Sequence, residues 1–298
     1  MKYPILIALC CLCYSNNCLF AQNETVQEAI LLQHHKEIGA TRDFINKRIA
    51  NCVDSLKMRL ENQTRTRIYN EYIYLIHLPK VDEKKELQID FDFIRNNPSS
   101  KLCLKLLSQG MLNKQYTDMY DTFYHYFTIL PDEEKYSSRG KMLTQEFINW
   151  KNNLVGSYAK DFEAKDIDNN RVKLSSYKNK NYVLLDFWGV HCGPCRHAMP
   201  YLKELYGKYH GKGLEIVGIS PDYDFDNWRQ AIKQDGTDIW RQVSQRLNNA
   251  DIFKEFYVQA MPVKILVDKD GKIIGRWYGD NKENNAALAQ KLQEAFGM

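Results

Sequence analysis

Two cysteines separated by a glycine and a proline lie in the stretch DFWGVHCGPCRHAMP, from Asp186 to Pro200. Cys192 and Cys195 are close enough in sequence to close a small disulfide ring, and a thiolate there could attack another disulfide. An inert structural disulfide is one alternative, but so small a loop constrains the unfolded chain very little. A metal clip is the other, but it needs four ligands, and the nearby His191 and His197 do not obviously converge with the cysteines. The pattern therefore favours redox chemistry.

The cysteine pair follows an apolar strand and opens a helix. The run NYVLLDFWG at 181–189 predicts a buried strand, and PYLKELYGKYH at 200–210 predicts an amphipathic helix. Backbone N–H groups at a helix N-terminus favour an anion, so we expect Cys192 to ionise readily and to attack a substrate disulfide. We expect Cys195, one turn later, to resolve the mixed disulfide.

The rest of the C-terminal half alternates strands with helices. LEIVGIS predicts a second buried strand, DFDNWRQAIKQDG a helix with Asp226 near its cap, VKILVDKDGKIIGRWYG a hairpin turning at Asp270-Gly271, and NKENNAALAQKLQEAF a final helix. This order indicates an α/β fold, a mixed sheet flanked by helices. Two acidic clusters, beginning at Asp166 and Asp222, lack the glycine and glutamate of a calcium loop, so we expect turns there.

These motifs together resemble the thioredoxin superfamily, in particular the exported thiol–disulfide oxidoreductases of the TlpA/ResA type. The resemblance covers residues 156–298 and rests on LLDFWGVHCGPC, GLEIVGISPD, AMPVKILVDKDGKIIGRW, and AKDF followed by VKLSSYKNKNYVLL. It implies a thioredoxin-like α/β domain whose redox-active disulfide is Cys192–Cys195, with no other cofactor and no metal. The long gap from Cys192 to Pro262 fits an extra element that these relatives carry between two core strands.

The resemblance also assigns roles around the pair. It implies that Cys192 attacks and that Cys195 resolves. It matches Asp186 to a buried aspartate that exchanges a proton with Cys195, although a purely structural strand residue is the simpler alternative. It implies a cis-proline loop at Met261-Pro262 that binds an extended substrate. The predicted substrate-binding residues are Met261, Pro262, Trp188, Gly193 and Pro194.

The sequence also departs from the family pattern. His191 stands where a tryptophan is usual, and either stabilises the thiolate or is exposed. Ala198 stands where ResA-like proteins often have an acid, which leaves Asp186 as the only acid expected beside the pair. Lys160 replaces a usual proline, which we interpret as a neutral surface change. LEIVGIS holds no basic residue to pair with Asp186, so the ionisation of that carboxyl stays open.

Residues 22–150 are predicted to form an all-α accessory domain. In TRDFINKRIANCVDSLKMRL the apolar residues recur at helical spacing, and Pro131 followed by acidic residues starts a further helix. A second stripe at helical spacing, interpreted as core and not as a ligand surface, consists of Tyr116, Tyr120, Phe123, Tyr124 and Phe127. Cys52 and Cys103 lie among apolar neighbours, where they either pair or stay buried thiols.

The chain begins like an exported protein. Residues 1–21 combine the positive Lys2, a short apolar run and Ala21 before the expected cleavage site, as a signal peptide does. We therefore expect a periplasmic protein, with a lipid anchor on Cys18 as the less favoured alternative. The apolar run is too short to span a bilayer, and we expect no transmembrane segment in the mature chain.

Charge and motifs limit the function. The 298 residues carry 41 Lys and Arg against 37 Asp and Glu, which gives no support for nucleic acid as a partner. We expect a periplasmic protein-disulfide reductase that acts on exported protein disulfides and takes electrons from a membrane donor. A copper metallochaperone and a redox-gated binding protein are the alternatives. A peroxiredoxin is disfavoured, because the sequence lacks a PxxxTxxC pattern.

Overall fold

The computed structural model groups the chain into two compact units. It describes residues 28–29, 31–40, 43, 47–48, 50, 83–112, 119–247 and 251–297. One unit comprises Met1–Gly110 and Asp121–Gly140, and the other Met111–Tyr120 and Lys141–Met298. The predicted boundaries at 22–150 and 156–298 stay predictions, and the second unit also takes in residues 141–155. The signal peptide, Cys18, Cys52 and Tyr116 lie outside the described residues, as does most of the first predicted helical stripe.

The described part of the N-terminal half is helical. Its elements include α4 (Glu83–Asn96), α5 (Leu102–Met111), α6 (Tyr120–Thr128), α7 (Asp132–Tyr136) and α8 (Ser138–Lys151). Aromatic rings join α4 to α6, because Phe91 stacks on Tyr126 with ring centroids 4.2 Å apart. Pro131 is the N-cap of α7, which confirms the predicted helix start.

The second aromatic stripe is mostly core, as predicted. Tyr120, Phe123 and Phe127 are buried. Tyr124 is 43% exposed, so its assignment to the stripe was wrong. The reason is that residue 124 lies about 100° around the helix from residue 123, beyond the buried face. Cys103 is buried and its Sγ donates to the carbonyl oxygen of Asn97 at 3.2 Å, and its pairing with Cys52 stays untested.

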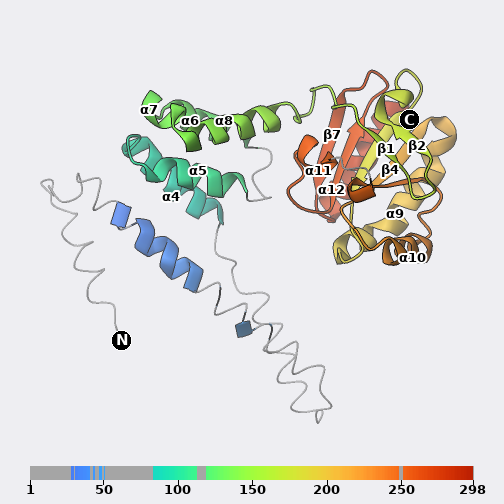
Figure 1. The fold of residues 1–298 in the computed structure, drawn as a ribbon, viewed down its shortest axis with the longest axis horizontal. Coiled ribbons are helices and arrows are strands. Elements are labelled where there is room, and N and C mark those ends of the chain that lie inside the picture. Colours follow the sequence, from blue (N-terminus) through green and yellow to red (C-terminus); the bar gives the residue numbers. More distant parts are fainter. Residues whose placement is uncertain are drawn as a thin grey trace, which may run out of the picture. The chain divides into compact units, whose positions relative to one another are not determined.

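A five-stranded mixed sheet forms the centre of the C-terminal unit (Figure 1). Its strands, in the order β5-β4-β3-β6-β7, are β5 (Arg241–Ser244), β4 (Leu214–Ser220), β3 (Tyr182–Phe187), β6 (Val263–Val267) and β7 (Ile273–Tyr278). β3, β4 and β5 run parallel, and β6 and β7 are antiparallel to their neighbours. The predicted mixed sheet and hairpin are confirmed, and Gly271 turns the hairpin with a φ of 86°. The short polar β5 was not predicted.

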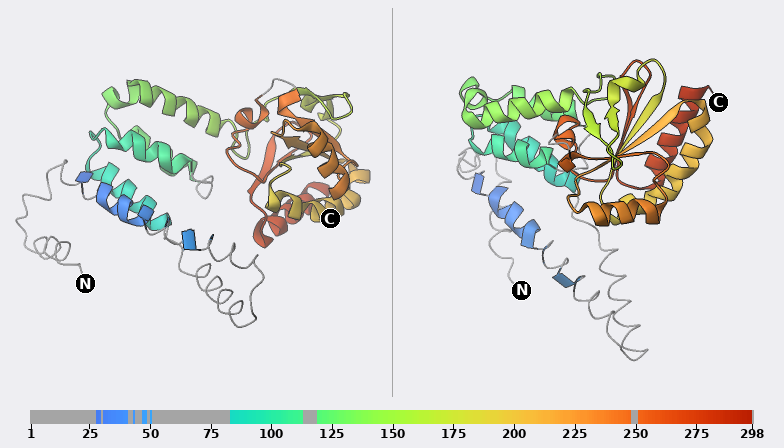
Figure 2. Two further views of the ribbon diagram at one scale, coloured as in Figure 1. Left: turned by 60° about the horizontal axis from the view of Figure 1, so that its bottom comes forward. Right: turned by 45° about the vertical axis from the view of Figure 1, so that its right-hand side comes forward.

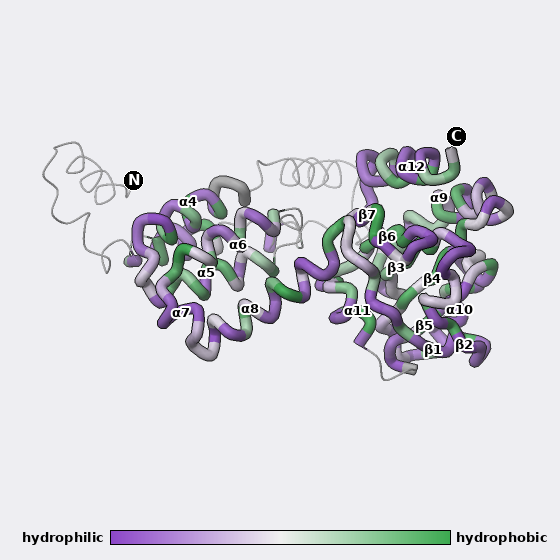
Figure 3. Tube along the Cα trace, turned by 90° about the horizontal axis from the view of Figure 1, so that it is seen from above, coloured by the Kyte–Doolittle hydropathy of each residue, from purple (hydrophilic) through white to green (hydrophobic). Residues whose placement is uncertain are grey.

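Helices cover one face of this sheet. Buried residues of α9 (Gly193–Tyr209), α10 (Phe225–Asp235) and α12 (Lys282–Phe296) form one cluster with Leu184 and Trp188 from β3 and the loop after it, and with Leu266 from β6. Figure 2 gives two further views of these helices, and Figure 3 shows the alternation of hydrophilic and hydrophobic residues along α12. The other face packs against β1 (Glu163–Lys165), β2 (Arg171–Lys173) and α11 (Ile252–Glu255). Short 3-10 helices η3 (Leu174–Tyr177), η4 (His210–Lys212) and η5 (Gln245–Leu247) join these elements.

The starts of two helices, α9 and α10, differ from those that the sequence predicted. α9 starts at Gly193 and passes through Pro200, where the sequence suggested a start. α10 is capped by Asp224, whose carboxylate accepts from the backbone N–H of Asn227, and Asp226 lies inside its first turn. A carboxylate one residue before the first helical turn is placed to satisfy a free N–H group there, which explains the correction.

The first acidic cluster is a turn, as expected. Asp166 accepts backbone N–H groups from Asp168 at 3.0 Å and Asn170 at 2.8 Å, and it pairs with Arg241. The part of the chain that the structure describes contains no group of three or more His, Cys, Asp or Glu residues that could hold a metal ion. In the same part, no helix is long and apolar enough to cross a membrane.

The strand beside β3 must have a glycine at residue 218. A Cβ atom added to Gly218 would lie 2.2 Å from Oε1 of Gln242. Gln242 cannot move aside easily, because it is buried, accepts from Trp188 Nε1 at 3.0 Å and donates to the carbonyl of Thr237 at 3.1 Å. The close approach of β4 and β5 behind Trp188 therefore depends on the missing side chain.

We expect Gly218→Ala to lower the free energy of unfolding by about 1–3 kcal/mol, as overpacking in a dense core does. Urea unfolding followed by tryptophan fluorescence measures this change. Gly207→Ala is the matched control, because Gly207 lies in α9 with nothing within 4 Å of an added Cβ. That control should stabilise the protein by about 0.5–1 kcal/mol. Equal effects of the two substitutions would contradict the packing argument.

Candidate active site

The central strand β3 delivers the cysteine segment to the start of α9. Four residues, 188–191, separate Phe187 from Cys192, which is the N-cap of α9. The backbone N–H of Cys192 donates to the carbonyl of Gly189 at 3.0 Å, which closes the turn. Cys192 Sγ accepts the backbone N–H of Cys195 at 3.2 Å. A sulfur held at this position meets the positive end of a 17-residue helix, which favours a thiolate over a thiol.

The two sulfurs are bonded to each other and differ in their exposure. Their Cα atoms are 5.2 Å apart in the Cys192–Cys195 disulfide. Cys195 is only 2% exposed, whereas Cys192 is partly exposed, and Gly193 and Pro194 between them are exposed. A partner can therefore approach Cys192 more easily than Cys195. This difference agrees with the predicted attacking and resolving roles, which stay predictions.

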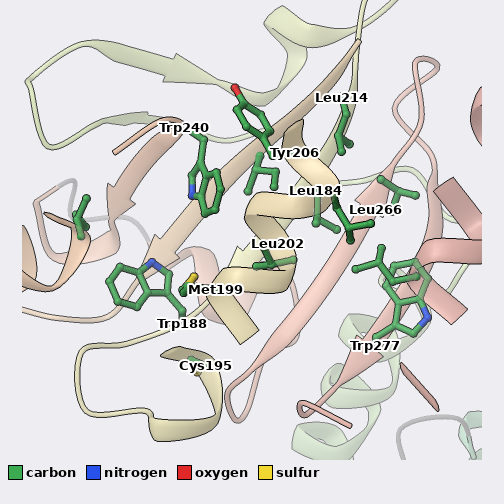
Figure 4. Packing of buried hydrophobic residues seen from close by; sticks show 14 of the residues in the cluster. Leu184, Trp188, Cys195, Met199, Leu202, Tyr206, Leu214, Trp240, Leu266 and Trp277 are labelled. Carbon is green, nitrogen blue, oxygen red and sulfur yellow. The ribbon is translucent and has the colours of Figure 1, made fainter. Parts of the chain in front are cut away.

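Large apolar side chains pack around the buried cysteine of the pair. Figure 4 shows Trp188 beside Met199, in the same cluster as Cys195 and Leu202. The side chain of Trp188 is fully buried and its indole N–H donates to Gln242. Trp188 was predicted to bind substrate. Its burial argues against a direct contact and gives it a supporting position.

The proline loop lies at the same edge of the sheet as the cysteines. The Met261-Pro262 peptide bond is cis, as predicted. Pro262 directly precedes β6, whose first residue Val263 pairs with Phe187 at the end of β3. Met261 packs against the cluster that contains Cys195, and an added Cβ at Gly189 would lie 3.3 Å from Met261 Cε. The structure therefore brings this loop onto the turn that carries the disulfide.

Asp222 fixes the same turn from the end of β4, and the sequence did not identify it. Its Oδ2 accepts the backbone N–H of Val190 at 2.9 Å and the hydroxyl of Ser220 at 2.7 Å. Its carbonyl accepts the hydroxyl of Ser244 at 2.8 Å. The only sequence signal was an acid directly after a buried strand, and the same signal occurs in ordinary turns.

Asp186 lies on β3 with its side chain on the α9 face. Because alternate residues of a strand point to the same face, Asp186 shares its face with Leu184 and Trp188, which cluster with Cys195. Asp186 is 2% exposed, and its Oδ2 has no hydrogen-bond partner in the described structure. Burial raises the pKa of Asp186 to about 6, although the charge of Lys264 opposes this rise. A carboxyl that titrates near neutral pH can both accept and return a proton.

Lys264 supplies the basic residue that the second strand lacks. It pairs with Asp186 in the antiparallel register of β3 and β6, and it is also 2% exposed. The only sequence signal was a lysine inside the apolar run VKILV, and hydrophobic patterning does not show which strand β6 would adjoin.

The remaining departures from the family pattern lie at the surface or in the core. His191 is exposed, Ala198 is buried, and Lys160 is exposed and pairs with Glu255 at 3.1 Å. The last observation agrees with a surface change at Lys160. His197 is held by Asp280, with Nδ1 2.6 Å from the carboxylate.

The C-terminal unit is similar to known redox proteins. The family model described as Redoxin matches residues 154–292. Thiol-disulfide oxidoreductase ResA of Bacillus thuringiensis subsp. konkukian is 33% identical over 139 residues, which are 46% of this chain and 78% of the relative. ResA of Bacillus anthracis is 32% identical over 155 residues, 51% of this chain and 87% of the relative. The crystal structure of a putative thiol:disulfide interchange protein DsbE from Chlorobium tepidum is 27% identical, with a TM-score of 0.45, over 48% of this chain and 99% of that one.

In the reduced protein near neutral pH, we expect iodoacetamide to modify Cys192 at least about tenfold faster than Cys195, because a buried thiol reacts slowly. Peptide mass spectrometry after partial labelling measures the ratio. Cys103, also buried, is an internal reference for a cysteine that reacts only on opening of its surroundings. Faster labelling of Cys195 would reverse the assignment of the two sulfurs.

We expect Asp186→Asn to remove a pH dependence from both stability and rate. The folded pKa of about 6 lies above the ordinary 3.8, so ionisation of Asp186 destabilises the folded state as pH rises. Between pH 4 and pH 8 the wild type should lose up to about 3 kcal/mol of unfolding free energy relative to the variant. The variant should also release mixed disulfides about 10- to 100-fold more slowly at pH 7.

Unfolding curves and single-turnover kinetics across this pH range test both effects. Asp166→Asn is the matched control, since Asp166 is another buried acid but pairs with Arg241 on β5. The control should keep the wild-type pH profile of the rate. An unchanged rate profile in Asp186→Asn would leave Asp186 with a structural role only.

Proposed function

The chain belongs to the ResA family of thiol–disulfide oxidoreductases, and from this premise we propose that it reduces disulfide bonds of exported proteins through the Cys192–Cys195 dithiol. One observation carries the proposal. The pair has one accessible sulfur at the start of α9 and one buried sulfur on the sheet face that holds Asp186. Such a pair can hold a partner covalently and then release it.

The first step joins the enzyme to its substrate. The thiolate of Cys192 attacks one sulfur of the substrate disulfide, a bond forms between those two sulfurs, and the other substrate sulfur leaves as a thiolate. The N–H of Cys195 and the helix N-terminus favour the attacking anion. The exposed Gly193 and Pro194 leave space for a protein partner beside the sulfur.

The second step releases the product. The Cys195 thiol gives its proton to the Asp186 carboxylate, and the resulting thiolate attacks Cys192 Sγ. The mixed disulfide breaks, and the second substrate sulfur leaves as a thiolate. Two electrons have then passed to the substrate, and the enzyme holds the Cys192–Cys195 disulfide. A carboxyl with a pKa of about 6 is suited to accept this proton at neutral pH.

Two features support the direction of electron transfer: the two residues between the cysteines, and the compartment to which we expect the chain to be exported. The Gly193-Pro194 dipeptide between the cysteines resembles that of reducing thioredoxins, whose reduction potential is roughly −270 mV. It is less similar to that of strongly oxidising proteins, whose reduction potential is roughly −120 mV. The N-terminal sequence is typical of export to the periplasm, where a reductase must be reduced again. We therefore propose that a membrane protein with a dithiol donates electrons to this reductase. Its two thiols would return the Cys192–Cys195 disulfide to the dithiol by the same exchange.

A resolving-cysteine variant tests this function directly. Cys195→Ser should still attack substrates but should not release them, so it should accumulate mixed disulfides through Cys192 in the cell envelope. Non-reducing electrophoresis should show bands of higher mass that reductant removes. The matched control Cys192→Ser should trap at least about tenfold less, because its remaining thiol is buried.

Two outcomes would contradict the proposal. If Cys195→Ser traps no protein while the reduced wild type binds Cu(I) tightly, the copper metallochaperone replaces the reductase. If the wild type is found mainly oxidised in cells and its loss leaves exported proteins with fewer disulfides, the direction of transfer is opposite.

A further inference from the structure

The C-terminal end of α11 has an unusual residue for its backbone. Phe256 is the C-cap of this helix. The backbone N–H of Tyr257 donates to the carbonyl of Lys254 at 3.1 Å, and the next backbone N–H, from Val258, donates to the carbonyl of Phe253 at 2.7 Å. In this Schellman pattern the residue after the cap is left-handed and is usually glycine. Here that residue is Tyr257, with a φ of 50°. A tyrosine at this φ is strained, which indicates that its side chain makes a contact that glycine could not make.

The ring of Tyr257 makes this contact with α8. It stacks on the ring of Trp150, with centroids 5.9 Å apart and an angle of 17° between the ring planes. Both side chains are buried. The Tyr257 hydroxyl is buried without a hydrogen-bond partner in the described structure, so the ring and not the hydroxyl explains the tyrosine. Stacked aromatic pairs at such distances stabilise a structure beyond the area that they bury.

Two further side chains hold the same helix end. Asn153, which follows α8, donates from Nδ2 to the carbonyl of Glu255 at 3.0 Å. Arg276 of β7 donates from Nη1 to the carbonyl of Phe256 at 2.9 Å and from Nη2 to the carbonyl of Tyr257 at 2.8 Å. The last carbonyl groups of a helix need such partners, because no intrahelical N–H follows them. The end of α11 is thus held both from β7 and from the end of α8.

This helix end is also the start of the proline loop. Only three residues, 259–261, separate Val258 from Pro262, whose carbonyl accepts the backbone N–H of Gly279 at 2.8 Å. β6 begins directly after Pro262 and is paired along both edges. Met261 in the loop packs against the cluster that contains Cys195. Because so short a segment is fixed at both ends, a change in the Tyr257 contact alters the loop beside the disulfide.

Trp150 lies in a part of the chain that the family model does not match. The match begins at residue 154, whereas α8 ends at Lys151. Trp150 and Tyr257 nevertheless belong to the same compact unit. Trp150 is itself surrounded by rings, because Tyr120 meets it edge-on at 5.5 Å and Phe147 stacks on it at 6.5 Å. The position of Trp150 is therefore set by packing that does not involve the loop.

We propose that Trp150 and Tyr257 are positioning residues for substrate capture: α8 holds the Tyr257 ring, the ring fixes the start of the proline loop, and the fixed loop binds the extended backbone of a peptide disulfide while Cys192 attacks it. This inference rests on the reductase reaction proposed above. A preformed loop spares the substrate the cost of ordering it, which favours extended peptide disulfides over small disulfides that have no peptide backbone.

The test compares two disulfides that lose the same leaving group. One is a peptide whose cysteine is bonded to thionitrobenzoate, and the other is dithiobis(nitrobenzoate), which has no peptide backbone. The Cys192 thiolate of the reduced, full-length protein attacks the peptide sulfur or one sulfur of the small reagent. A disulfide forms with the attacked sulfur, and thionitrobenzoate leaves as a coloured thiolate. Stopped-flow absorbance measures the two second-order rate constants.

Tyr257→Gly should lower the rate constant for the peptide about tenfold or more, because small displacements of a positioning group slow a reaction steeply. The rate constant for the small reagent should change by less than about twofold, because its attack does not use the loop. Glycine suits the backbone at residue 257, so the variant removes the ring without adding strain. Trp150→Leu should show the same selective loss. Tyr257→Phe is the matched control, since it keeps the ring and should keep both rate constants.

Phe91→Leu controls for a general loss of stability, since Phe91 is a buried, stacked ring in the other unit, and it should keep both rate constants. Equal losses for the two disulfides, no loss for the peptide, or the same loss in Tyr257→Phe overturns the proposal. If Tyr257→Gly or Trp150→Leu does not fold, the other variant decides alone. The proposed function fails separately: Cys195→Ser would then trap no exported protein, while the selective loss in Tyr257→Gly persists.

Discussion

The pairing of β3 between β4 and β6 is the constraint on which the active site depends. β3 is buried on both faces and paired along both edges, so its end at Phe187 is fixed in space. Only four residues then separate Phe187 from the N-cap of α9, and Asp222 holds that turn from the end of β4. Because Val263 pairs with Phe187, the same register also brings the cis-proline loop to this edge.

Much of this arrangement could be predicted from the sequence because buried strands are continuous apolar runs. VLLDF, LEIVGIS and VKILV have this pattern, and the turn at Asp270-Gly271 identifies the hairpin. The cysteine pair between a strand and a helix identified the chemistry. β5 was missed because RQVS is short, and its arginine and glutamine obscure the apolar pattern.

The remaining features of the candidate site depend on contacts between segments far apart in the sequence. The hydrophobic periodicity of the sequence does not predict such contacts. A lysine in VKILV is unusual, but only the β3–β6 register shows that it faces Asp186. Asp222 had the same sequence context as a turn residue, and only its bonds to Val190 and Ser220 reveal what it holds. Trp188 has a sequence position beside the cysteines, yet its hydrogen bond to Gln242 keeps it in the core.

The burial of Cys195 also restricts the kinetic scheme. In the proposed reductase cycle, the electron donor and the disulfide substrate each form their mixed disulfide with Cys192, because Cys195 is buried. They cannot occupy the enzyme together, so turnover alternates between two half-reactions without a ternary complex. Excess donor then competes with substrate for one docking surface, and steady-state rates follow a ping-pong pattern with parallel double-reciprocal lines.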